Sequence, residues 1–230
     1  MKLPTPLHKG FLLKRYKRFL ADVELDDGAV VTAHTPNTGS MLQCAVPGHE
    51  VLISVSENRA RKLPYTLELI RVNGYWVDTN TQRANRVVEE GLRCGNVRGF
   101  EGCLVNPEFR FGKSRIDFML QSDQFRALLE VKNVTLLDGS GRACFPDAVT
   151  VRGQKHLREL ISAAEQGWRA IIFFLVQRGE ADAFAPADHI DAEYGRLLRQ
   201  AIEQGVEAVA MRTRVSQDEV SLDCSIPVEI

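Results

Sequence analysis

The sequence predicts an α/β (α+β) protein in two parts: a small N-terminal β-barrel over residues 1–80 and an α/β domain with a mixed sheet over residues 81–230. Three observations predict this architecture. Short apolar segments separated by turn residues fill the first part, as in a barrel of short strands. Near residue 80 the apolar period changes to that of an amphipathic helix. Beyond it, helices alternate with strands, which is the order of an α/β domain.

Composition excludes several protein classes. The chain has 230 residues, 44% hydrophobic and 26% charged, so it can bury real cores. No window approaches the roughly 18 to 20 apolar residues of a membrane span, and the N-terminus lacks a signal-peptide core. We therefore expect a cytoplasmic protein with no membrane partner. The five cysteines form no Cys-x-x-Cys pair, so neither a disulfide framework nor a zinc site is indicated. The net charge of -1 argues against binding nucleic acid through bulk positive charge, although a local basic patch is compatible with it.

The first part is expected to contain about five short strands, a number that favours an oligonucleotide-binding (OB) barrel. Turn signals such as Asn73-Gly74, which favours a hairpin, separate them. The expected strands are Arg18–Leu25, Val30–His34, Glu50–Ser56, Thr66–Val72 and Tyr75–Val77.

A basic segment with interleaved aromatic residues lies in this barrel, and Arg59-Ala60-Arg61-Lys62 forms a second basic group. Basic side chains neutralise phosphates while an aromatic ring offers a stacking surface. The side chains expected to contact nucleic acid are Lys14, Arg15, Tyr16, Lys17 and Arg18. The alternative is a solvated strand edge protected by charge. The loop of residues 34–40 could cradle an anion with its backbone donors, although turn formation alone would also explain it.

An amphipathic helix is expected from Thr79 to Cys94, capped by Thr79 or Asn80 and ended by Gly95. Its apolar stripe comprises Ala84, Val87, Val88 and Leu92. Glu90 is a candidate further metal ligand if this helix packs under the sheet. The alternative is an ordinary solvated glutamate.

The central chemical signal lies in two neighbouring segments, residues 113–120, which begin with Lys113, and residues 127–133. The connection between them is polar and short, so the two segments should pair as an antiparallel hairpin. Side chains two apart on a strand share a face, so Glu130 and Lys132 should project together. By the same rule, the apolar residues Ile116, Phe118 and Leu120 should share one face and leave Asp117 on the other.

If the hairpin register sets Asp117 beside Glu130, two carboxylates and one ammonium group converge. This set is typical of a metal-dependent phosphodiesterase, in which Asp117 and Glu130 bind Mg²⁺ or Mn²⁺. Lys132 would then orient or help deprotonate water and offset charge on the phosphate. The alternative is a cross-strand ion pair on a solvated face. The apolar neighbours of Glu130 argue against it, since they indicate an interior strand where charges are costly.

After this hairpin, a long loop over residues 134–149 leads to a helix capped by Thr150, with an apolar stripe at Leu157, Leu160, Ile161 and Ala164. The start of a helix favours a nearby phosphate. Further side chains expected to contact nucleic acid are Arg115, Arg152, Lys155 and His156, the last being alternatively a general acid or a surface histidine. Residues 168–177 form an apolar central strand, followed by a helix over residues 191–204 and strands over residues 206–211 and 219–230.

Taken together, these segments resemble the sugar fermentation stimulation protein family, SfsA. The matching blocks are Arg15–Val23, Pro36–Met41, Ser114–Phe118, Glu130–Leu136, Phe145–Thr150 and Arg152–Leu160. The resemblance implies an OB-like domain joined to a domain like the PD-(D/E)xK nucleases. It also implies DNA binding without sequence preference and a role in regulating sugar use, maltose in particular.

Within that nuclease pattern, Asp117, Glu130 and Lys132 match the core positions, and Gln154 matches a polar helix position of some members, which makes it a further catalytic candidate. The chain departs from the family in one loop. Thr35 stands where the family pattern has a cysteine, so no essential thiol is expected there.

Two functions compete on this evidence. The first is a metal-dependent nuclease, which the intact acidic pair with its lysine favours. The second is a non-catalytic DNA-binding regulatory factor for sugar metabolism. The sequence shows no helix-turn-helix for reading bases, and no Gly-rich loop or nucleophile motif supports a small-molecule enzyme. The expected partner is single- or double-stranded DNA, with RNA as an alternative, and a homodimer is one option for the oligomeric state.

Overall fold

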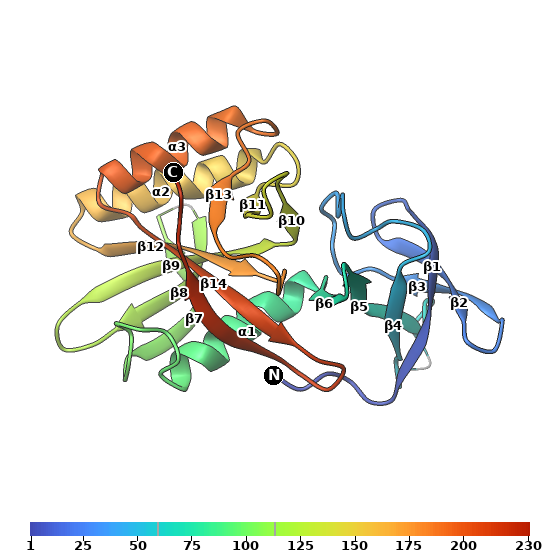
Figure 1. The fold of residues 1–230 in the computed structure, drawn as a ribbon. Helices are drawn as coiled ribbons and strands as arrows, with labels where there is room; N and C mark the ends of the chain where they lie inside the picture. The colour runs from blue at the N-terminus through green and yellow to red at the C-terminus, as the bar shows by residue number, and fades with distance from the viewer. Residues whose placement is uncertain (59, 113) are drawn as a thin grey trace.

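The computed structural model describes residues 1–58, 60–112 and 114–230 (Figure 1). Arg59 of the second basic group and Lys113 at the start of the central hairpin lie outside the described residues. A β-barrel and a larger α/β domain lie side by side (Figure 1). In the described parts of the chain, no helix combines the length and the apolar character needed to cross a membrane.

The barrel is built by the first six strands. They are β1 (Leu7–Tyr16), β2 (Leu20–Leu25), β3 (Val30–His34), β4 (Glu50–Val55), β5 (Tyr65–Val72) and β6 (Tyr75–Asp78). The sheet order is β3-β2-β1-β4-β5-β6, and a further pairing of β3 with β5 closes it. Its core contains Leu12, Val23 and Ile53. The OB-like barrel that the sequence predicted is confirmed.

The α/β domain contains a six-stranded mixed sheet of order β15-β14-β12-β9-β8-β7. Its strands are β7 (Leu104–Phe111), β8 (Ser114–Gln121), β9 (Arg126–Val134), β12 (Arg169–Val176), β14 (Glu207–Val215) and β15 (Val220–Ile226). The strand β12, which is apolar after Arg169, pairs parallel with both β9 and β14, as expected of a covered central strand. A small second sheet contains β10 (Leu136–Leu137), β11 (Ala143–Phe145) and β13 (Phe184–Pro186).

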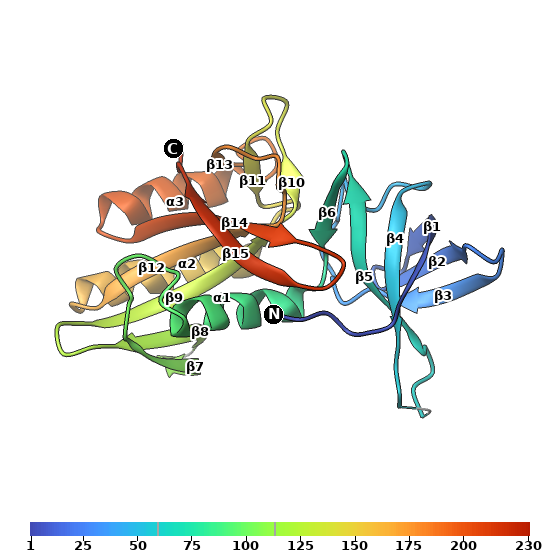
Figure 2. The same cartoon turned by 60° about the horizontal axis from the view of Figure 1, so that its bottom comes forward.

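Three helices cover the two faces of the mixed sheet (Figures 1 and 2). One face packs on α1 (Thr81–Arg93), and the other packs on α2 (Val151–Glu165) and α3 (Ala192–Glu203). Asn80 caps α1 and Thr150 caps α2 through side-chain oxygens that accept backbone N–H groups. The predicted caps and the buried stripe of α1 are therefore confirmed.

One expectation about the central hairpin is wrong. Ile116 packs against the α2 and α3 side of the sheet, whereas Phe118 and Leu120 pack against the α1 side. The alternation breaks because the ladder between β7 and β8 steps over the pair Glu108 and Asp117, and Glu108 has a positive φ of 56°. Asp117 therefore lies at the point in β8 where the side-chain alternation changes.

The barrel is fastened to the α/β domain by buried polar contacts. Arg83 of α1 pairs with Asp78 at 2.7 Å and with Glu68 of β5. On the opposite side, Gln43 of the barrel exchanges two hydrogen bonds of 2.8 Å with the backbone of Leu137. Burial raises the pKa of Asp78 to about 6, although Arg83 opposes the shift. These contacts hold the two domains around a common cleft.

Candidate active site

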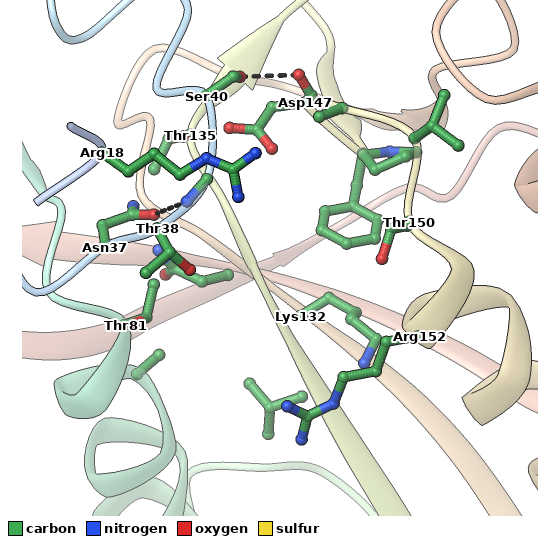
Figure 3. A pocket seen from close by; sticks show the side chains of 18 of the residues that line it. Arg18, Asn37, Thr38, Ser40, Thr81, Lys132, Thr135, Asp147, Thr150 and Arg152 are labelled. Carbon is green, nitrogen blue, oxygen red and sulfur yellow. Dashed lines mark hydrogen bonds between the residues drawn. The ribbon is translucent and has the colours of Figure 1, made fainter. Parts of the chain in front are cut away.

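A cleft of about 920 Å³ lies between the barrel and the α/β domain. The barrel contributes Arg15, Tyr16, Arg18 and the loop of residues 37–40. The α/β domain contributes the start of α1, strands β8 and β9, the loop before α2 and the first turns of α2 (Figure 3). The cleft therefore brings the two charged clusters of the sequence to one place.

Asp117 of β8 and Glu130 of β9 are linked through hydrogen bonds to backbone N–H groups. One oxygen of Asp117 accepts a hydrogen bond from the backbone N–H of Val131 at 2.8 Å, and the other accepts one from Asn85 at 2.8 Å. The Oε2 atom of Glu130 accepts from the backbone N–H of Asp117 at 3.4 Å. These hydrogen bonds, just beyond the antiparallel ladder of β8 and β9, bring the two carboxylates close together.

Lys132 lies on the same strand face as Glu130, with its Nζ atom 2.7 Å from Oε1. Both side chains are nearly buried, with 2% of Glu130 and 9% of Lys132 exposed. The structure therefore brings together the three residues that the two-residue spacing and the hairpin predicted. A buried ammonium group beside a carboxylate is the arrangement expected of a positioned catalytic lysine.

His156 of α2 is a part of this site that the sequence placed differently. It is 5% exposed, its Nδ1 atom contacts Oε1 of Glu130, and Nδ1 lies 3.2 Å from Nζ of Lys132. Because an ionised carboxylate only accepts, Nδ1 carries the proton in this contact. The Nε atom of Arg152 donates to Nε2 of His156 at 3.4 Å. His156 is thus buried against Glu130 rather than lying at the surface, and it also lines the cleft.

The electrostatics of the two carboxylates differ. Burial, followed by the charge of Glu130, raises the pKa of Asp117, and hydrogen bonds only partly offset this. Burial also raises the pKa of Glu130, but Lys132 and His156 outweigh it, so the pKa of Glu130 is lowered. The pair therefore contains one stabilised carboxylate, Glu130, and one, Asp117, whose ionisation is disfavoured by burial and by its neighbour.

This carboxylate pair fits a divalent cation. Asp117 and Glu130 supply the hard oxygen ligands that Mg²⁺ and Mn²⁺ prefer, and a cation would relieve the repulsion between them. Among the described residues, no group of three or more His, Cys, Asp or Glu side chains is placed to hold one ion. Two protein carboxylates, with water and substrate phosphate as further ligands, form the common Mg²⁺ coordination pattern.

The structure does not bring Glu90 or Gln154 to this cluster. Glu90 is half-exposed and pairs with the N-terminal ammonium group at 2.7 Å. It lies five residues after Asn85, or about 140° around the helix, so only Asn85 faces Asp117. Gln154 donates to both oxygens of Asp191, at 3.0 and 3.1 Å, and so supports the cap of α3. The helical period could have identified Asn85 once the face of α1 toward the sheet was known.

Two residues predicted to contact nucleic acid, Arg115 and Lys155, are not among the residues that line the cleft. Arg115 is exposed and pairs with Glu108 at 3.0 Å. Lys155 is exposed and donates to Ser114 at 2.8 Å. Both are used in surface contacts of the α/β domain, whereas Arg152 lines the cleft.

The residues of the basic segment in the barrel also differ in whether their side chains bind other parts of the protein or line the cleft. Arg15 donates to the backbone carbonyls of Asn37, Gly39 and Ser40 at 2.8, 2.9 and 3.1 Å, so it holds the loop of residues 37–40. Burial lowers the pKa of Arg15. Lys14 pairs with Asp22 at 3.3 Å and lies over the ring of Tyr16, which itself donates to Asp22 at 3.1 Å.

At the end of the basic segment, Lys17 and Arg18 form a turn with positive φ angles of 49° and 66°. Lys17 is exposed at this turn. The guanidinium group of Arg18 is directed toward the cavity from the barrel side, while Arg152 approaches from α2 (Figure 3). Arg18 and Arg152 are therefore cleft-lining cations on two different walls.

Comparison with known proteins gives matches over the whole chain. The family model "Sugar fermentation stimulation protein RE domain" matches residues 82–219, and the model "SfsA N-terminal OB domain" matches residues 13–78. The chain is 66% identical over 228 residues to the "Sugar fermentation stimulation protein homolog" of Syntrophotalea carbinolica, covering 99% of each protein. It is 54% identical over 232 residues to the protein of the same description from Geobacter sulfurreducens, covering 99% of this chain and 98% of that protein.

A solved structure is also similar over its full length. It is described as "The structure of Pyrococcus Furiosus SfsA in complex with Ca2+", and it matches with a TM-score of 0.90 and 28% identity. The match covers 100% of both chains. The arrangement of barrel and α/β domain is therefore shared with that protein.

Proposed function

The chain belongs to the sugar fermentation stimulation protein family, and on that premise we propose that its cleft binds DNA without sequence preference and hydrolyses phosphodiester bonds with Mg²⁺ or Mn²⁺. One observation carries this proposal. Asp117, Glu130 and Lys132 converge, largely buried, in a cleft that cationic side chains from both domains line. Such a group of buried charges is costly for folding alone, and a functional site explains it.

Each side chain has a role in this proposal. Asp117 and Glu130 would hold the cation, which when bound supplies Lewis-acid stabilisation of phosphate charge and lowers the pKa of a bound water. Lys132 would orient the attacking water and offset charge on the phosphate. Arg18 and Arg152 would hold neighbouring phosphates from the two walls. The relative from Pyrococcus furiosus was solved in complex with Ca²⁺, which supports a cation site in this family.

His156 and Asn85 have supporting roles. His156 contacts one oxygen of Glu130, and Asn85 donates to one oxygen of Asp117. These contacts fix the orientation of the two carboxylates before a cation binds. Neither side chain needs to contact the reacting phosphate itself.

A second function is favoured by the descriptions of the relatives, which refer to sugar fermentation. The protein would then be a non-catalytic DNA-binding regulatory factor for sugar metabolism, maltose in particular. In that case the cleft would bind DNA through Arg18 and Arg152, and the carboxylate pair would not act on the phosphate. The two functions differ in one measurable property, which is strand cleavage that depends on metal.

The deciding experiment incubates the purified protein with labelled single-stranded, duplex and branched DNA and with RNA, in Mg²⁺, Mn²⁺ or EDTA. The Lys132→Ala variant is treated in parallel. Cleavage that requires metal and is lost in the variant supports the nuclease and identifies its substrate. Binding without cleavage under every condition supports the regulatory function and contradicts the nuclease.

A further inference from the structure

One segment of the barrel, residues 36–41, lies between the start of α1 and the loop before α2 and lines the cleft. We name this segment the barrel wall. At its start, the carbonyl of Pro36 accepts from the backbone N–H of Thr81 at 3.2 Å and from its hydroxyl at 2.9 Å. At its end, Ser40 donates to the carbonyl of Asp147 at 2.7 Å, and the N–H of Met41 donates to the carboxylate of Asp147 at 3.0 Å. The wall is therefore fastened to α1 on one side and to the loop before α2 on the other.

The barrel wall is also rigid within itself. Arg15 binds three of its carbonyl oxygens, and the side chain of Asn37 accepts from the N–H of Gly39 at 2.8 Å. A Cβ atom on Gly39 would lie 3.0 Å from Asn37 and 3.1 Å from the carboxylate of Asp147, so the backbone approaches both closely. Behind the wall, Gln43 is bonded to Leu137. A segment with these contacts is a fixed boundary and not a lid.

The position of the wall limits how a strand can lie in the cleft. Figure 3 shows Ser40 and Asp147 at one side of the cavity and Lys132 with Arg152 at the other. A chain running along the cleft past Lys132 therefore meets the wall. The volume of about 920 Å³ is enough for a few nucleotides of a single strand.

From this geometry we infer that the substrate is a nucleic-acid strand with a free end, which enters the cleft as far as the barrel wall and is cut a few nucleotides from that end. The inference rests on the proposed nuclease function and names its substrate class. In the reaction, the oxygen of water bonds to phosphorus and the bond from phosphorus to one sugar oxygen breaks. That oxygen takes up a proton, so one product carries a phosphate and the other a hydroxyl group.

The test compares linear and circular single-stranded DNA of the same sequence, with Mn²⁺ and the full-length protein. We expect the linear strand to be cut at least about tenfold faster than the circle, with short products from the earliest times. Equal rates on the two substrates, or internal fragments of random length, would overturn the inference while leaving the nuclease standing. Cleavage of neither substrate would overturn the inference, and the nuclease function itself is decided by the duplex, branched DNA and RNA substrates of the preceding experiment.

A variant tests the wall directly. In Ser40→Ala/Asp147→Ala the contacts at one end of the wall are removed, so we expect the preference for linear over circular DNA to fall severalfold. Ser140→Ala, which removes a hydroxyl bonded to Asp138 in an exposed turn, is the matched control and should keep the preference. Thermal unfolding shows whether the double variant is folded. An unchanged preference for linear DNA in a folded double variant would contradict the role of the barrel wall. If the double variant does not fold, the lengths of the products made by the unaltered protein test the same inference.

Discussion

The acidic cluster of the α/β domain and the basic segment of the barrel use their charges in opposite ways. In the acidic cluster, Asp117, Glu130 and Lys132 all face one another and the cleft. In the basic segment, Arg15 is used to bind backbone carbonyls and Lys14 pairs within the barrel, so their charges serve the fold. Arg18, in contrast, directs its charge toward the cavity (Figure 3).

The difference follows from local backbone geometry. On β9 the strand period alone decides that Glu130 and Lys132 share a face. In the basic segment, β1 ends at Tyr16 and the chain turns through Lys17 and Arg18 with positive φ angles. A turn of that kind resets the direction of each side chain, so spacing in the sequence carries little information about where the charge lies.

The largest expected effect comes from the acidic cluster. Asp117→Asn should lower the rate of metal-dependent cleavage on the order of 10³-fold, because it removes a charged ligand of the proposed cation. DNA binding should be retained or strengthened, since negative charge near phosphate is lost. The measurements are single-turnover cleavage and a binding titration with the same DNA.

The same variant makes a prediction about stability without metal. Burial and Glu130 raise the pKa of Asp117 in the folded protein, so the stabilising contribution of this carboxyl is present at low pH and is lost as pH rises through that pKa. Asp117→Asn removes this loss, so in EDTA at neutral pH its Tm should exceed that of the unaltered protein. The difference should shrink on acidification below the ordinary pKa of aspartate. A lower Tm at neutral pH would show that the hydrogen bonds to Asp117 outweigh the repulsion.

The second largest effect is expected on stability, at Arg15 of the basic segment. Arg15→Ala removes the donor to three carbonyl groups of the barrel wall, so it should lower the free energy of unfolding by about 2 kcal/mol. Chemical denaturation monitored by circular dichroism measures this change. A stability equal to that of the unaltered protein would show that water replaces the guanidinium group without cost.

Arg18→Ala is the matched substitution three residues away. It should leave stability within about 0.5 kcal/mol, because the side chain is exposed at a turn. DNA binding should weaken by about fivefold to tenfold. The slope of log Kd against log salt concentration should fall by about 1, as expected for the loss of one phosphate contact. Binding titrations at several salt concentrations give both numbers. Unchanged affinity and slope would exclude Arg18 from the nucleic-acid interface.

The parts of the fold and of the site that the sequence predicted are those set by residues close together in the chain. The barrel, the mixed sheet, the caps Asn80 and Thr150, and the convergence of Glu130 with Lys132 all follow from periods and turns within one or two elements. The roles of His156 and Asn85 do not, because they depend on how a helix rotates against the sheet. The change of side-chain alternation at Asp117 was missed for a similar reason, since it lies opposite Glu108, a residue of the neighbouring strand with a positive φ.

A smaller effect is expected at Gln154, whose predicted position in the site the structure does not support. Gln154→Ala removes hydrogen bonds to Asp191, the cap of α3, and should lower the free energy of unfolding by about 1 kcal/mol. Asp191 keeps the backbone N–H groups of Thr150 and Tyr194 as donors. The kcat of cleavage should change less than about twofold. A large fall in kcat with unaltered stability would restore Gln154 to the catalytic group.

The smallest effect is expected at Glu90, and it is compared with the effect at Asn85 of the same helix. Glu90→Gln should change neither cleavage nor stability beyond about 0.5 kcal/mol, because Glu90 is half-exposed and its partner is the N-terminal ammonium group. Asn85→Ala, by contrast, removes the donor to Asp117 and should lower the affinity for Mn²⁺ by about tenfold. Calorimetric titration of Mn²⁺ into both variants measures this contrast. A loss of Mn²⁺ affinity in Glu90→Gln would mean that α1 turns its other face to the cation, and the site would have to be redrawn around Glu90.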